Sequence, residues 1–335
     1  MQKNVAEKIV FKLYDPFSQR DIVKDIWTSL LKICPHTYFM SWDWKELWIH
    51  KIARDCKLSL VAGFLNELPV LAFFVGTKTT RRYNIYKFRQ LSVDSTLIPA
   101  IDNSLYVEYD GILINPEITI SLTSLMENIP MKWDELHIPR CTSIYNPNFK
   151  ISSSNSKRHN LLIKDSRAYY VDLDKVRNHN NDYLALLSQN KRKQIRRSLK
   201  EYEKIGEIRI DIADNIESAL EIFGELIELH QMILTERWQP GTFSNKSIVD
   251  FHKSLISRRF EYGEIQLLKV TTGDLTIGYL YSFIYNDKHF GYICAFNYLP
   301  GKFYKPGLVS HHLSILHYAE NGLSCYDFLE GEGGY

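Results

Sequence analysis

The apolar positions of the chain follow two spacings that alternate along its length. In some stretches apolar residues recur every three or four positions, as on the buried face of a helix; in others they form short continuous or alternating runs, as in strands. The helical stretches are residues 18–33, 41–53, 121–127, 182–204, 215–235, 247–259 and 307–320. The extended stretches are residues 58–65, 70–75, 83–91, 135–138, 208–212, 265–270, 275–285, 289–296 and 324–328.

The order of these elements repeats once. Each half is expected to hold a pair of helices, a β-meander, one more helix and a final strand, and the 335 residues are long for a single core. A polar, turn-rich segment separates the halves. We therefore predict a first domain at 1–150, a linker at 151–168 and a second domain at 169–335. The fold class is mixed α/β (α+β), with a mixed, mainly antiparallel sheet flanked by helices in each domain.

The overall charge is close to neutral, with 41 Lys and Arg against 39 Asp and Glu. Proteins that coat DNA or anionic membranes usually carry a larger basic surplus, so no DNA partner is expected. The 5 cysteines are scattered and form no CxxC pair, so neither a zinc site nor any other metal is expected. Because the sequence shows no signal-peptide pattern and no bilayer-length apolar run, it predicts a cytoplasmic protein without a membrane span.

The segment between the extended stretch 289–296 and the helix after it is rich in Gly, Lys and aromatic residues. The first amides of a helix lack intrahelical acceptors and, with the helix dipole, favour phosphates. Lys302 and Lys305 would add positive charge, and Gly307 would allow a ligand to approach closely. The segment is therefore a candidate phosphate site, and the alternative is an ordinary loop that caps a buried helix.

A second candidate is the basic run from Lys191 to Lys200, which holds six cations and no acid. On a helix, Lys193, Arg196, Arg197 and Lys200 share one face, opposite Ile195 and Leu199. Such a face could recognise an anionic substrate or carrier, or it could be a solvated outer surface. Contact with RNA has no interleaved aromatic residues to support it.

If the chain is an enzyme, its reaction would need a group that takes up a proton. Asp327 lies at the end of an extended stretch, where a pocket would open beside the meander, and is the better candidate base. His230 is the second candidate, although a histidine on an apolar helix is more often structural. Some enzymes instead rely on positioning alone, with water relaying the proton.

Several of these stretches resemble one enzyme family. In the second half they are 191–197 with Gly206; Leu229-His230 with Arg237-Trp238 and 241–243; and 304–308 with 319–322 and 327–332. In the first half the stretch is 39–44. Together they are similar to the CelD-like acetyltransferase family of the GNAT superfamily, whose architecture is related to that of the Fem aminoacyl transferases. The resemblance implies two tandem GNAT-like domains, with the donor bound on the second.

The resemblance also implies an acyl-CoA co-substrate, acetyl-CoA or another, whose pyrophosphate rests on the start of the last helix. The implied donor residues are Lys305, Gly307, Leu308, Val309 and Ser310, and the substrate-binding candidates are Lys193, Arg196, Arg197 and Trp238. In that family the chain continues beyond the position of Asp327 into further strands. If this chain is a C-terminally truncated fragment, its second sheet is expected to lack an edge strand.

The function expected from these features is an acyltransferase of the GNAT type. It would move an acyl group from acyl-CoA to an amine or hydroxyl of a small molecule or glycan, such as a polysaccharide precursor. Two alternatives remain at this point. One is Fem-like aminoacyl transfer from charged tRNA, and the other is a non-catalytic GNAT-fold module that binds a partner in polysaccharide assembly.

Overall fold

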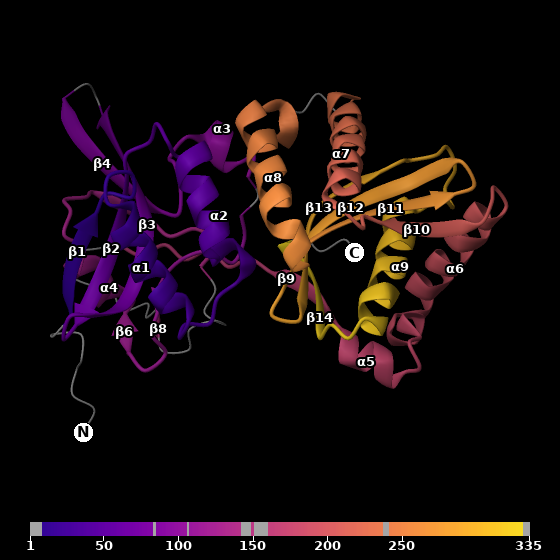
Figure 1. The fold of residues 1–335 in the computed structure, drawn as a ribbon, viewed down its shortest axis with the longest axis horizontal. Helices are drawn as coiled ribbons and strands as arrows, with labels where there is room; N and C mark the ends of the chain where they lie inside the picture. Colours follow the sequence, from indigo (N-terminus) through magenta and orange to yellow (C-terminus); the bar gives the residue numbers. More distant parts are fainter. Residues whose placement is uncertain are drawn as a thin grey trace. The chain divides into compact units, whose positions relative to one another are not determined.

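A computed structural model gives the structure of the chain (Figure 1) and describes residues 9–82, 85–105, 107–141, 149–150, 160–236 and 241–330. The chain forms two compact units, Met1–Lys164 and Asp165–Tyr335. Each unit has its own sheet and its own apolar core. The predicted linker falls largely on residues 151–159, outside the described residues.

The first unit is built on a six-stranded sheet in the order β1-β2-β3-β4-β7, with β5 added beside β3. Its elements are β1 (Val10–Tyr14), α1 (Arg20–Leu31), α2 (Trp42–Leu47), β2 (Leu58–Leu65), β3 (Leu68–Arg82), β4 (Tyr86–Val93), α3 (Pro99–Asp102), β5 (Leu113–Ile114), β6 (Ile120–Ser121), α4 (Leu122–Asn128), β7 (Glu135–His137) and β8 (Phe149–Lys150). The strands pair antiparallel except for β4 with β7 and the separate pair of β6 with β8.

Local sequence explains two of the sharpest features of this unit. Asn66 and Glu67 take positive φ values of 50° and 65°, the conformation of a tight hairpin between β2 and β3. Ser41 caps α2, and its hydroxyl accepts a hydrogen bond of 3.3 Å from the amide of Trp44. The predicted helix at 41–53 continues past α2 as a π turn over Trp48–Ile52.

The first unit also buries an ionic cluster. Lys45 Nζ lies 2.9 Å from Asp94 Oδ1 and 2.6 and 2.7 Å from the two carboxylate oxygens of Asp110. Lys45 is 1% exposed and also lies 5.7 Å from the ring of Trp27 and 5.6 Å from that of Trp48. Burial and the charge of Asp110 outweigh the attraction of Lys45 and raise the pKa of Asp94 above its usual value. The cluster thus depends on Lys45 to offset buried negative charge.

The second unit is built on a six-stranded sheet in the order β10-β11-β12-β13-β14-β9. Its elements are β9 (Ala168–Asp172), α5 (Leu173–Asn178), α6 (Gln189–Glu203), β10 (Ile208–Ile212), α7 (Ile216–Glu236), α8 (Lys246–Arg259), β11 (Ile265–Thr272), β12 (Leu275–Tyr285), β13 (Lys288–Phe296), α9 (Pro306–Glu320) and β14 (Cys325–Glu330). The strands pair antiparallel except for β13 with β14.

The helix predicted over 182–204 is in fact two elements. A 3-10 turn over Tyr183–Leu186 comes first, and α6 then begins after Ser188, whose hydroxyl accepts a hydrogen bond of 3.4 Å from the amide of Lys191. Leu187 takes an extended conformation between the two. The prediction of one helix was therefore wrong, because the serine cap separates two stretches whose apolar spacing happens to be continuous.

One strand of the second sheet was not predicted. β9 pairs antiparallel with β14, for example Val171 with Tyr326. The strand β14 therefore has a neighbour on both sides, and β9 is the strand at this edge of the sheet. The strand was missed because it directly follows the polar segment between the halves and is only five residues long.

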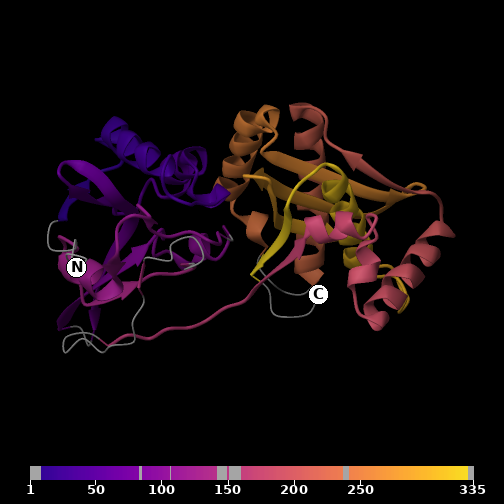
Figure 2. The same cartoon turned by 90° about the horizontal axis from the view of Figure 1, so that it is seen from below.

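Helices cover both faces of the second sheet. Figure 1 shows α7 and α8 on one side of the strands and α9 with α6 on the other, and Figure 2 shows the same layers from below. Mainly antiparallel sheets with helices on their faces confirm the predicted mixed fold class. None of the helices in the described part of the chain is long and apolar enough to cross a membrane.

Candidate active site

The central feature of the second unit is a fork between two parallel strands. β13 and β14 pair over three positions, of which Phe290 with Asp327 is the last. Just beyond the fork, β13 carries a bulge. Tyr281 of β12 pairs with Ile293, but the next residue, Ser282, pairs with Gly291. Tyr292 is therefore the extra residue of the bulge. A fork of this kind leaves backbone N–H and C=O groups of both strands facing an opening, where an extended ligand with amide groups can pair with them.

The helix α9 starts close to this fork and has no side-chain cap. Its N-cap is Lys305 and its first residue is Pro306, so the amides of Gly307 and Leu308 are the first without an intrahelical acceptor. Both residues are half-buried, whereas Val309 and Ser310 are buried. The Ser310 hydroxyl is buried and finds no hydrogen-bond partner among the described residues. The predicted donor residues therefore form one helix start that can bind an anion.

Gly307 has a packing role in addition to its place at the helix start. A Cβ atom at this position would lie 3.2 Å from Cε2 of Phe296, the last residue of β13. The absence of a side chain thus lets α9 approach the strand that leads into it. A bulky substitution at Gly307 would disturb this contact, so it would not report on ligand binding alone.

The basic helix α6 contacts the loop that leads into α9. The amide of Lys305 donates a hydrogen bond of 2.9 Å to Oγ of Ser198, which is fully buried in α6. Lys193, Arg196 and Arg197 are exposed on the other side of that helix. The structure therefore brings two of the predicted sites together, the basic run and the start of α9.

The opposite face of the sheet holds a hydroxyl–histidine network that sequence reasoning missed. His252 of α8 is fully buried, and its Nδ1 lies 3.3 Å from the hydroxyl of Tyr281, while its Nε2 lies 3.3 Å from that of Tyr292. Tyr292 is half-buried and is the bulge residue beside the fork. No local spacing links α8 to the bulge, so only the tertiary fold shows this network.

Asp327 lies at the fork and on this same face. It is paired with Phe290, which faces Phe283 of β12, and paired residues of neighbouring strands point to the same side of a sheet. Asp327 Oδ1 accepts a hydrogen bond of 2.7 Å from the amide of Leu329, whose φ is 65°. The carboxylate therefore shapes the bend at which β14 departs from β13, and it also stands beside the opening.

The other predicted residues are placed as follows. His230 of α7 packs its ring edge-on against Phe243 at 5.4 Å, and its Nδ1 is buried without a hydrogen-bond partner among the described residues. Burial lowers the pKa of His230. Trp238 lies outside the described residues.

Buried histidines make the second unit sensitive to acid. Burial lowers the pKa of His252 to about 3 and that of His311 in α9 to about 4, both below the ordinary value of 6.5. The unfolded chain therefore takes up protons between about pH 6.5 and 4 that the folded chain excludes. We expect full stability above pH 6.5 and a loss of about 2 to 3 kcal/mol per histidine by about pH 4.5.

Thermal unfolding followed by circular dichroism from pH 7.5 down to about pH 4.5 measures this effect. A midpoint that stays constant over the whole range would show that these rings are hydrated or paired in the folded unit.

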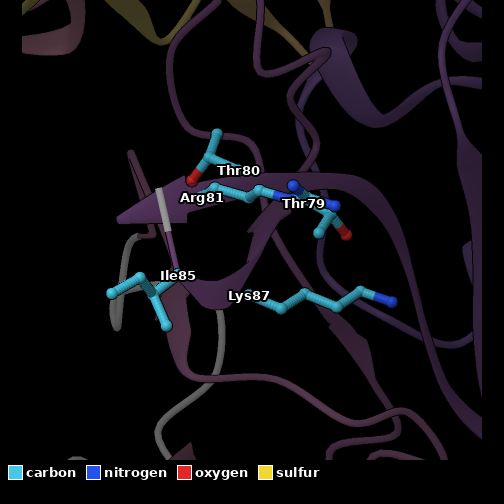
Figure 3. A pocket seen from close by; sticks show the side chains of 5 residues that line it. All are labelled: Thr79, Thr80, Arg81, Ile85 and Lys87. Carbon is cyan, nitrogen blue, oxygen red and sulfur yellow. The ribbon is translucent and has the colours of Figure 1, made fainter. Parts of the chain in front are cut away.

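The first unit carries a pocket that is unrelated to this chemistry. It lies at the end of the β3–β4 hairpin and is lined by Thr79, Thr80, Arg81, Ile85 and Lys87 (Figure 3). All the lining residues belong to two strands and their turn, and none is a base or a nucleophile with an activating partner nearby. Among the described residues no group of three or more His, Cys, Asp or Glu side chains is arranged to hold a metal.

Comparisons with known proteins agree with this geometry. Residues 189–335 match the family model for the acetyltransferase (GNAT) domain. The crystal structure of FemX is similar to the chain, with a TM-score of 0.50 and 11% identity over 96% of this chain and 90% of FemX, which supports a common fold. No curated protein matches the chain.

Two other solved structures are similar at lower TM-scores. L-PGS from Bacillus licheniformis has a TM-score of 0.44 at 10% identity, over 93% of this chain and 78% of that one. A tandem GNAT protein from the clavulanic acid biosynthesis pathway has a TM-score of 0.43 at 10% identity, over 98% and 91%. The match assigns residues 189–335 to the acetyltransferase (GNAT) domain, and the chain is a GNAT acyltransferase-like protein.

Proposed function

We propose that the chain transfers an acyl group from acyl-CoA to an amine or hydroxyl of a sugar or a polysaccharide-related acceptor. The observation that carries the proposal is the fork between β13 and β14 beside the uncapped start of α9. The fork offers backbone partners to an extended amide-containing arm, and the helix start offers amides to a pyrophosphate. An acyl-CoA has both chemical groups in the order that this arrangement requires.

The proposed donor residues are Lys305, Gly307, Leu308, Val309 and Ser310. The amides of Gly307 and Leu308 would donate to phosphate oxygens, and Lys305 would add its charge from the N-cap position. This fit rests on amides without an intrahelical or side-chain acceptor, which the described part of α9 provides.

The proposed reaction is direct attack on the thioester without a covalent enzyme intermediate. The acceptor nitrogen or oxygen bonds to the acyl carbon, the carbon–sulfur bond breaks, and the sulfur leaves as a thiolate that takes up a proton. Asp327, at the fork, is the proposed acceptor of the proton that the nucleophile loses, directly or through water. His230 is a second candidate for this role, and Trp238 for holding the acceptor.

A transfer assay tests the proposed function. The purified chain is mixed with acetyl-CoA and a panel of amino sugars and neutral sugars, and free thiol release is measured. We expect thiol release that depends on one acceptor class and survives ribonuclease. Transfer that instead requires charged tRNA and is destroyed by ribonuclease would contradict the acyl-CoA donor and support Fem-like aminoacyl transfer.

A further inference from the structure

The exposed face of α6 has no structural explanation in the packing of the second unit. Its buried side, with Ile195, Ser198 and Tyr202, holds the helix against the rest of the unit. Its exposed side carries four cations, namely Lys193, Arg196, Arg197 and Lys200. Like charges that are close together on one helix repel each other, and an anionic partner bound to this face would reduce that repulsion.

The contacts of α6 fix this basic face relative to the loop that leads into α9. Besides the hydrogen bond from the Lys305 amide to Ser198, the ring of Tyr202 packs edge-on against that of Tyr304 at 5.0 Å. The carbonyl of Tyr202 in turn accepts a hydrogen bond of 2.8 Å from Oγ1 of Thr272 in β11. The helix is therefore tied both to the sheet and to the residues just before α9, and Figure 1 shows α6 and α9 side by side.

Two cations converge on a single ring in this loop. The guanidinium of Arg197 lies 3.1 Å from the ring centre of Phe303, and Nζ of Lys302 lies 5.1 Å from the same ring. A guanidinium stacked on a ring keeps its N–H groups in the plane of the stack, where they can bind a phosphate by two hydrogen bonds. An ammonium beside it adds charge without competing for that geometry. Together, the guanidinium of Arg197 and the ammonium of Lys302 are the kinds of group that bind a phosphate monoester.

We propose that Arg197, together with Lys302, binds the ribose 3′-phosphate of the CoA donor and makes the protein selective for it. The proposal rests on the proposed acyl-CoA function. The pyrophosphate of the donor would lie at the start of α9, and the phosphorylated ribose would extend toward α6 over Phe303. The basic helix then recognises the donor, rather than an anionic acceptor, because the loop residues that it contacts lead directly into the donor helix.

Titration calorimetry on the full chain tests this assignment, with CoA and 3′-dephospho-CoA as the two ligands. For the unchanged protein we expect CoA to bind about tenfold more tightly, because a bidentate, charge-assisted contact is lost with the phosphate. Arg197→Gln should weaken CoA by about tenfold and leave 3′-dephospho-CoA unchanged. Arg209→Gln is the matched control, since Arg209 is an exposed arginine of β10 that pairs with Glu207. It should change neither affinity.

The outcomes separate this inference from the function on which it rests. Equal affinity of the unchanged protein for the two ligands would overturn the phosphate assignment and leave the acyl-CoA function intact. Equal weakening of both ligands by Arg197→Gln, or the same loss from Arg209→Gln, would also overturn it. If neither ligand binds, both proposals fail. Lys302→Gln, which leaves the Arg197–Phe303 contact in place, should show the same selective loss even if Arg197→Gln lowers the unfolding temperature.

Discussion

Replacing Leu308 by glutamate is expected to weaken acetyl-CoA binding by at least about 100-fold while leaving the fold intact. Leu308 is the third residue of α9 and is half-buried. A glutamate at this position can reach back to the unsatisfied amides of its own helix, which stabilises the helix start. The same carboxylate would occupy and repel the proposed phosphate position. Calorimetric titration of acetyl-CoA into the variant measures the loss.

Leu308→Gln is the control for this variant. It has nearly the same shape without the charge, so binding should stay within a few-fold of that of the unchanged protein. The unfolding temperature of Leu308→Glu should be equal to or above that of the unchanged protein. If the glutamate variant binds acetyl-CoA normally, the donor phosphates do not lie at the start of α9.

Replacing Lys45 by methionine is expected to destabilise the first unit by about 3 to 5 kcal/mol. The change leaves Asp94 and Asp110 buried, at 5% exposure each, without the cation that both carboxylates contact. Lys45 also lies beside the rings of Trp27 and Trp48. Urea unfolding followed by tryptophan fluorescence therefore reports directly on this region.

A triple variant is the control for the buried cluster. Lys45→Met combined with Asp94→Asn and Asp110→Asn removes the charges together, so it should recover most of the lost stability. A loss below about 1 kcal/mol for Lys45→Met alone would mean that the two carboxyl groups are already neutral in the folded unit.

Features set by neighbouring residues could be predicted from the sequence. The hairpin between β12 and β13 turns at Asn286 and Asp287, both at positive φ, as residues of these types predict. The start of α9 was predicted from Pro306 and Gly307 and lies there. In each case one or two residues with a strong backbone preference determine the conformation.

Features that depend on residues distant in sequence could not be predicted. Lys45 lies between Trp44 and Glu46 in a short helix, where a lysine is expected to be exposed, and its partners come 49 and 65 residues later. The pairing of β9 with β14 joins segments more than 150 residues apart. Neither arrangement leaves a periodic signal in the chain.

The candidate site shows the same division. The helix start at Gly307 and Leu308 could be recognised as an anion site because its chemistry is local. The packing of Phe296 against Gly307, the stacking of Arg197 on Phe303 and the network of His252 with Tyr292 all join separate elements. The proposed donor residues could therefore be named from the sequence, but the side chains that lie around them could not.

The decisive test of the proposed donor site is calorimetric titration of acetyl-CoA into the unmodified full chain. We expect micromolar binding with a stoichiometry of about one donor per chain, because only the second unit is proposed to hold the donor site. A folded protein that gives no binding heat with either acetyl-CoA or free CoA, at concentrations up to about 1 mM, would contradict it.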